Sequence, residues 1–185
     1  MAWSLSRFKP AAPASTKRNL LKTATQGSVF WLLFVVAAPL LLVRLESIVG
    51  LEQFEFPSQT WSPWIVFVPA ALLNLYSGYS MATLGHGTPL PTDCARSLVL
   101  GGAYGHVRNP MGVGGLLAMA CVGCALGSPF TIALSICGGV VWNVFVRPIE
   151  ERELEDRFGA DYAAYKSSVR CWVPRFRAYR PMRDG

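Results

Sequence analysis

The sequence predicts an all-α integral membrane protein: a bundle of about four transmembrane helices followed by a polar, amphipathic helical segment. Of the 185 residues, 52% are apolar and only 15% are charged, whereas soluble domains carry about 25% charged residues. The apolar residues gather in long runs instead of alternating with polar ones, which is typical of membrane spans. The length indicates one domain, expected over residues 28–185.

The first predicted span covers about residues 28–50 and follows a basic segment, residues 1–27, that contains no acid. We interpret the basic segment as a cytoplasmic tail, although its composition also fits an organelle transit peptide. Pro39 is expected to kink the span. Reaching spanning length admits Arg44 and Glu46 near its end.

The second predicted span covers residues 63–84 and is polar in its second half. Asn74, Ser77 and, one turn on, Met81 share a helical face. Such a stripe inside a span faces the helix bundle or a cavity, so we expect it to contact other spans.

The third and fourth predicted spans, residues 111–127 and 130–146, form a hairpin around a tight Ser-Pro turn. The third is rich in Gly, Ala and Cys, and its Gly123 and Gly127 form a G-x-x-x-G pair that allows close helix approach. Residues 85–110 form the loop that leads into this hairpin.

The C-terminal segment, residues 147–185, is polar. Its apolar residues recur at three- and four-residue spacing and share one helical face. This face is expected to pack on the bundle or lie on the bilayer, with Gly159 capping a first short helix. The residues are Leu154, Phe158, Tyr162, Tyr165 and Val169.

Basic residues predict the topology. Five Lys or Arg precede the first span, one lies in the first loop, two lie in the 85–110 loop and nine follow the fourth span. The segments rich in Lys and Arg belong on the cytoplasmic side, which places both termini and the 85–110 loop there. The net charge of +6 is therefore assigned to topology and anionic lipid rather than to nucleic acid.

The five cysteines are odd in number and three lie in apolar runs, which argues against a disulfide framework. Cys121 and Cys124 make a C-x-x-C, a spacing also used in redox and metal sites. Within a span we interpret them as small packing residues.

The predicted cytoplasmic face collects residues suited to a zwitterionic ligand with an aromatic base. Arg96, Arg108 and Asn109 suit a carboxylate or phosphate, and Tyr104 suits the base. The pair Glu150-Glu151 suits an ammonium or ribose hydroxyls. A plainer alternative makes Arg108 and Arg147 lipid-facing anchors and Glu150-Glu151 the acidic first turn of a helix.

One pattern of motifs adds to this interpretation. It runs Arg96-Ser-Leu-Val-x-x-Gly102-x-Tyr104-x-x-x-Arg108-Asn109-Pro110, then two short spans, then Glu150-Glu151-x-x-Leu154-x-x-x-Phe158-Gly159-x-x-Tyr162-x-x-Tyr165. Over about residues 83–175 it resembles the isoprenylcysteine carboxyl methyltransferase and phospholipid methyltransferase superfamily. These are integral membrane enzymes that use S-adenosylmethionine.

The resemblance implies a set of site residues and a lipophilic or small-molecule methyl acceptor, such as a prenylcysteine carboxylate, a phospholipid amine or a thiol. It implies cofactor contacts from Arg96, Ser97, Leu98, Val99, Tyr104, Arg108, Asn109, Pro110, Met111, Gly112 and Glu150. It places Arg147, with Glu151, nearest the acceptor.

The chain departs from the family pattern at two positions: Gly112 stands where Tyr is frequent, and Ala103 where Pro is frequent. An amine acceptor requires a base, for which His106 and His86 are candidates, although a structural or exposed role suits each of them. Two other functions stay open: an NADPH-dependent reductase of the sterol-reductase type, and a non-catalytic membrane protein that retains the helical scaffold.

Overall fold

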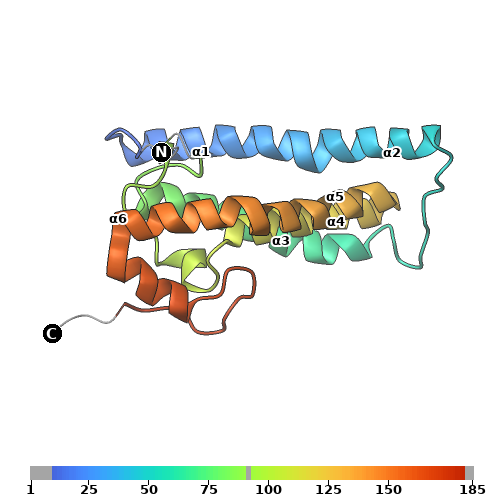
Figure 1. Cartoon of the computed structure of the whole chain (residues 1–185). Helices are drawn as coiled ribbons and strands as arrows, with labels where there is room; N and C mark the ends of the chain where they lie inside the picture. Colours follow the sequence, from blue (N-terminus) through green and yellow to red (C-terminus); the bar gives the residue numbers. More distant parts are fainter. Residues whose placement is uncertain (1–9, 91–92, 182–185) are drawn as a thin grey trace, which may run out of the picture. The chain divides into compact units, whose positions relative to one another are not determined.

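A computed structural model describes residues 10–90 and 93–181 (Figure 1). This part of the chain forms four long helical segments without a β-strand, which confirms the predicted fold class. The first helix comprises α1 (Thr16–Trp31), the π-helical turn η1 (Leu32–Ala37) and α2 (Ala38–Ile48); α3 (Ser62–Leu84) follows. After the short 3-10 turn η3 (Gly102–Gly105) come α4 (Pro110–Leu126) and a last helix made of α5 (Pro129–Val141), η4 (Trp142–Val146) and α6 (Arg147–Ser168).

Three of the four helices are long and apolar enough to cross a membrane: Thr16–Ile48, Ser62–Leu84 and Pro129–Ser168. The remaining helix, α4, is also apolar but has 17 residues, about 26 Å. Large apolar side chains on the helices are exposed, among them Leu41 at 69% and Leu75 at 67%. Exposed apolar helix surface of this extent is what a bilayer covers.

The first helix begins earlier than predicted. Its N-terminus is at Thr16, so residues 16–27, which we assigned to the tail, form its first turns. Ser15 explains the start, because its Oγ accepts a hydrogen bond from the Arg18 N–H at 3.3 Å, as an N-cap does. Residues 1–9 of the predicted tail lie outside the described residues.

Two helices contain a π-helical turn, and each turn ends two residues before a proline. The turn η1 precedes Pro39 and η4 precedes Pro148. A proline lacks the N–H for the helical ladder and its ring pushes on the carbonyl four residues earlier. Widening the preceding turn relieves both effects, so the irregularity predicted at Pro39 takes the form of a π-helical turn.

The chain divides into two compact units. The membrane unit contains residues 26–75 and 111–146, and the polar unit contains residues 10–25, 76–90, 93–110 and 147–181. The polar unit includes α6, in which nearly half of the 22 residues are charged. The spanning part of the last helix is therefore α5 with η4, and α6 lies outside the hydrocarbon region.

Small residues let the helices of the membrane unit approach closely. A Cβ built on Gly114 would lie 2.7 Å from the Ala70 carbonyl oxygen, and one on Gly123 would lie 2.8 Å from Ile132. The predicted role of Gly123 in the hairpin is thus confirmed. Gly127 instead occupies the turn with φ of +62°, a conformation that favours glycine.

Polar side chains join these helices, as the predicted stripe on the second span requires. Asn74 on α3 accepts a hydrogen bond from Trp31 Nε1 at 3.1 Å and donates one to the Met111 carbonyl on α4 at 3.0 Å. Ser135 on α5 donates to the Leu116 carbonyl at 2.8 Å. Each bond satisfies a group that lipid cannot.

Two adjacent glycines on α4 provide a test of this packing. Gly114→Ala is expected to lower the free energy of unfolding by about 1–3 kcal/mol, because the new methyl group meets backbone. Gly115→Ala is the matched control, since its Cβ would meet only Asn74 Nδ2 at 3.7 Å. Thermal unfolding in detergent measures both, and equal stability of the two variants would contradict the close approach of α3 and α4.

Candidate functional site

The loop after α3 is fixed by several contacts within the polar unit. The Gly85 carbonyl accepts hydrogen bonds from the N–H groups of Arg96 and Ser97, at 2.7 and 3.2 Å. Lys22 pairs with Asp93 at 2.8 Å, and Arg157 donates to the Ala95 carbonyl at 2.6 Å. The backbone that leads into the predicted ligand residues 96–99 is therefore fixed by contacts at Gly85, Asp93 and Ala95.

The glycine-rich turn η3 holds Tyr104 in a buried position. Gly102 has a φ of +62°, and a Cβ there would collide with the Ser80 hydroxyl on α3. Tyr165 donates its hydroxyl to the Tyr104 carbonyl at 2.6 Å. The Tyr104 side chain is buried, and this burial raises the pKa of its phenol. The ring is therefore an uncharged, buried group next to the predicted ligand residues.

The amphipathic face of the C-terminal segment packs on this loop, whereas the predicted alternatives were the helix bundle and the bilayer. Tyr162, Tyr165 and Val169 form a buried cluster, against which Leu98 and Leu100 pack. Gly159, with φ of +49°, changes the direction of α6 (Figure 1). The predicted helix break there is confirmed.

The chain after α6 forms a strap, residues 169–181, along the loop. The N–H groups of Arg108 and Asn109 donate to the carbonyls of Arg170 and Cys171 at 3.0 and 3.1 Å. Further along, the N–H groups of Arg175 and Tyr179 donate to the carbonyls of His106 and Gly105, at 2.9 and 2.8 Å. Sequence reasoning missed this pairing, because backbone bonds carry no side-chain signature.

His106 is part of the same pairing. Its Nδ1 lies 2.8 Å from the Arg175 carbonyl oxygen and must donate, since a carbonyl only accepts. This contact supports the structural role for His106 over the role of a base. The other candidate, His86, is exposed and has a φ of +53°.

Glu151 is the centre of an ion cluster. Its carboxylate pairs with Arg108 at 2.6 Å, Arg147 at 2.9 Å and Lys166 at 2.9 Å. Burial alone would raise the pKa of Glu151, but hydrogen bonds from Lys166 and Arg108 hold it below its ordinary value. Glu151 is therefore an anion engaged by three cations.

Arg108 links the cluster to the strap. Its Nε donates to the Val169 carbonyl at 2.7 Å, and its Nη1 contacts the Tyr162 hydroxyl at 3.2 Å as well as Glu151. Only 10% of its side chain is exposed. The alternative of a lipid-facing anchor is therefore wrong for Arg108.

Glu150 differs sharply from its neighbour. Within residues 10–90 and 93–181, no hydrogen bond or ion pair joins its carboxylate to another side chain. Burial, and then the negative charge of Glu151, raise the pKa of Glu150 to about 7. Among the described residues, Glu150 is therefore a half-buried carboxylate without a cation partner.

The remaining predicted residues lie at different depths. Arg96 and Ser97 are exposed, Leu98 is half-buried, and Val99 and Pro110 are buried. Asn109 stands directly before α4. Met111 and Gly112, in the first turn of α4, belong to the membrane unit.

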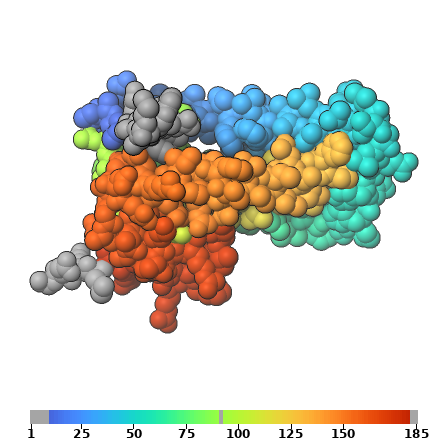
Figure 2. Space-filling model, viewed as in Figure 1, coloured from blue at the N-terminus to red at the C-terminus, as the bar shows by residue number. Residues whose placement is uncertain are grey.

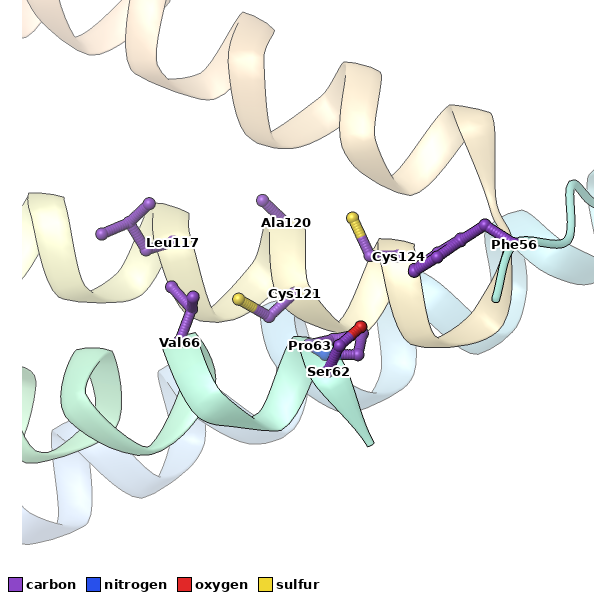
Figure 3. Close-up of a pocket in the computed structure, with 8 residues that line it drawn as sticks. All are labelled: Phe56, Ser62, Pro63, Val66, Leu117, Ala120, Cys121 and Cys124. Carbon is purple, nitrogen blue, oxygen red and sulfur yellow. The ribbon is translucent and has the colours of Figure 1, made fainter. Parts of the chain in front are cut away.

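The membrane unit contains an apolar pocket of about 230 Å³ between the start of α3 and the end of α4 (Figure 3). Phe56 lies at one end and Leu117 at the other. The lining residues are Phe56, Ser62, Pro63, Val66, Leu117, Ala120, Cys121 and Cys124. The two cysteines of the C-x-x-C thus line an apolar space, consistent with their interpretation as packing residues.

A family model for phospholipid methyltransferases matches residues 61–161. The match begins just before α3 and ends within α6, and so includes the loop, the hairpin and three members of the ion cluster, Arg108, Arg147 and Glu151. The protein is an integral membrane methyltransferase by family: the chain belongs to the phospholipid methyltransferase family, within the superfamily that the motifs indicated. A search of curated proteins finds no significant match.

Proposed function

We propose that the protein transfers a methyl group from S-adenosylmethionine to a lipophilic acceptor. The observation that carries the proposal is the environment of Glu150, a half-buried carboxylate that has no cation partner among the described residues, beside the fully paired Glu151. A ligand with an ammonium group or ribose hydroxyls supplies what this carboxylate lacks. S-adenosylmethionine offers both, and members of this superfamily use it.

The residues of the polar unit suit such a cofactor. Arg96 and Ser97 are exposed on a fixed backbone, where they are available to a carboxylate. Tyr104 and Val99 supply buried apolar wall. We assign further cofactor contacts to Leu98, Arg108, Asn109, Pro110, Met111 and Gly112 on the resemblance to the superfamily.

Glu151 is assigned a positioning role. Its contacts orient Arg147, which stands at the junction of η4 and α6 and is our candidate for the residue nearest the acceptor. Bound S-adenosylmethionine supplies an electrophilic methyl group on a sulfonium. The chain then has to align donor and acceptor and exclude water. A carboxylate or thiolate acceptor attacks directly, whereas an amine must also lose a proton.

A lipophilic acceptor is supported by the membrane unit. Its helices expose apolar side chains to lipid. An acceptor with a hydrocarbon chain reaches these helices from the bilayer, while the cofactor reaches the polar unit from water. This division of access explains why the reaction takes place at a membrane.

Binding of S-adenosylmethionine to the purified protein is the direct test. Glu150→Gln is expected to weaken binding by a factor of about 10 to 100, the loss of a hydrogen bond to a charged group. Glu153→Gln makes the same change on the same helix and is expected to bind normally. Calorimetry in detergent measures all three proteins. A wild type that binds no S-adenosylmethionine would sink the proposal, and NADPH would be the next ligand to try.

The affinity should also depend on pH. With the pKa of Glu150 at about 7, roughly a tenth of the free protein carries the anion at pH 6 and nine tenths at pH 8. Since apparent affinity scales with the competent fraction, binding should tighten about tenfold over this interval. Titrations of wild type and Glu150→Gln at both values check this, and an equal change in the two proteins would assign it to another group.

The raised pKa of Glu150 also affects folding stability, which should fall as the pH rises while the affinity for the cofactor increases. Because the pKa of Glu150 rises from 4.5 to about 7, the folded chain holds this proton more tightly than the unfolded chain does. Without a bound cation, the contribution of Glu150 to the free energy of unfolding therefore falls as the pH rises through this window.

A further inference from the structure

The strap carries an exposed apolar and basic loop, residues 172–177 with the sequence Trp-Val-Pro-Arg-Phe-Arg. Phe176 is fully exposed and Val173 is 53% exposed. A phenylalanine with no contact surface at the tip of a short loop is unusual in a folded chain. Figure 2 shows the C-terminal part of the chain, in red, with a narrow projection from its surface.

The loop is held firmly at both ends, so its exposure is imposed by the fold. Before it, the carbonyls of Arg170 and Cys171 accept bonds from residues 108 and 109. Within and after it, Arg175 pairs with His106, and Tyr179 packs its ring on Tyr165 at 5.4 Å.

These bonds join the strap to the part of the chain that directly precedes α4. Residue 109, which holds Cys171, is followed directly by the apolar helix α4. Burial raises the pKa of the Cys171 thiol, and the charges of Arg108 and Arg147 oppose that rise. Cys171 thus lies near both Arg108, just before α4, and Arg147, just after the span of α5 and η4.

The charge of the strap complements a phospholipid surface. From Tyr162 to Arg180 the sequence contains no acidic residue. Arg170, Arg177 and Arg180 are exposed, whereas Arg175 uses its guanidinium on the Ser168 carbonyl at 3.0 Å. Exposed arginines around an apolar tip are typical of segments that enter the headgroup region of an anionic membrane.

We infer that residues 172–177 bind the membrane surface, with Val173 and Phe176 entering the interfacial region and Arg177 and Arg180 contacting anionic phospholipid phosphates. The strap thereby connects the lipid surface to the backbone of residues 105–109. The inference does not depend on the identity of the cofactor or on methyl transfer.

Hydrogen–deuterium exchange of the full chain tests the inference. The probes are nanodiscs of phosphatidylcholine alone and of an equal mixture with phosphatidylglycerol, compared with detergent. The amides of residues 173 and 176–178 are expected to exchange more slowly in nanodiscs, and most slowly in the anionic ones. Since an arginine near an anionic surface contributes a factor of about five in binding, Arg177→Gln should reduce the difference between the two bilayers by about that factor.

The entry of the Phe176 side chain into the interfacial region is tested by a matched pair of variants, Phe176→Ser and Phe176→Leu. The fully exposed side chain makes either change safe for folding, and only the serine variant should lose protection. Exchange that is the same in detergent and both nanodiscs would overturn the inference. So would protection that rises with protein concentration in detergent, because the loop would then be covered by a second copy of the chain.

Discussion

Arg108→Ala is expected to lower the free energy of unfolding by about 3 kcal/mol or more and to abolish methyl transfer. Removing one partner of a buried ion pair leaves the other charge uncompensated. The substitution strips Glu151 of its shortest contact, at 2.6 Å. It also leaves the Val169 carbonyl and the Tyr162 hydroxyl without their bonds to the guanidinium.

Lysine cannot replace Arg108. The arginine uses two nitrogens in fixed directions, Nε toward Val169 and Nη1 toward Glu151 and Tyr162. An ammonium is a single point of charge without this fork. We expect Arg108→Lys to recover the contact with Glu151 but not the one with Val169, and so to have intermediate stability.

Thermal unfolding in detergent and methyl transfer to a lipid mixture measure these effects. Arg96→Ala is the control for stability, because Arg96 is exposed and its fixed part is the backbone N–H. An Arg108→Ala protein as stable as Arg96→Ala would show that the ion cluster does not hold the strap on the loop.

Local patterns predicted much of the fold. The hairpin followed from two apolar runs around a Ser-Pro turn, and the face that includes Tyr162 and Val169 followed from helical spacing. The break at Gly159 followed from the freedom of glycine at positive φ. Each of these features is decided within a few residues of sequence, where periodicity and turn chemistry apply.

Most features that sequence reasoning missed depend on contacts between distant segments, such as the pairing of Lys22 with Asp93. The start of the first helix at Thr16 is the exception, because the Ser15 cap that sets it is a local contact. The strap pairs residues about 60–75 positions apart through backbone groups, which every residue possesses. No spacing rule identifies such partners.

Within the candidate site, the pair Glu150-Glu151 shows what sequence reasoning could not predict. Glu150 and Glu151 are neighbours of the same type. Residue chemistry alone suited both to one ligand, and the family resemblance assigned Glu150 to the cofactor and Glu151 to the acceptor side. About 100° of helix rotation separates them. Within the described part of the chain, Glu151 pairs with three cations and Glu150 with none. Which acid is structural and which is available to a ligand emerges only from the packing of α6 on the loop and the strap.

Glu46 is the other charged residue whose role the sequence concealed. Near the end of the first span it appeared as an unfavourable residue, yet it is fully buried in the membrane unit. Its Oε1 accepts bonds from the Phe130 N–H at 2.7 Å and the Ser128 hydroxyl at 2.8 Å. The carboxylate therefore caps the N-terminus of α5, where the helix dipole favours an anion, and joins α2 to the hairpin.

Glu46→Ala is expected to lower the free energy of unfolding by about 2–3 kcal/mol, because the Phe130 N–H loses its partner in a buried place. Glu46→Gln retains an acceptor oxygen of the same reach and should lose less than half as much. Thermal unfolding of the two variants in detergent separates these effects. Equal losses would mean that the negative charge, and not the hydrogen-bonded cap, stabilises the junction of α2 with the hairpin; no loss in either would show that the turn between α4 and α5 closes without Glu46.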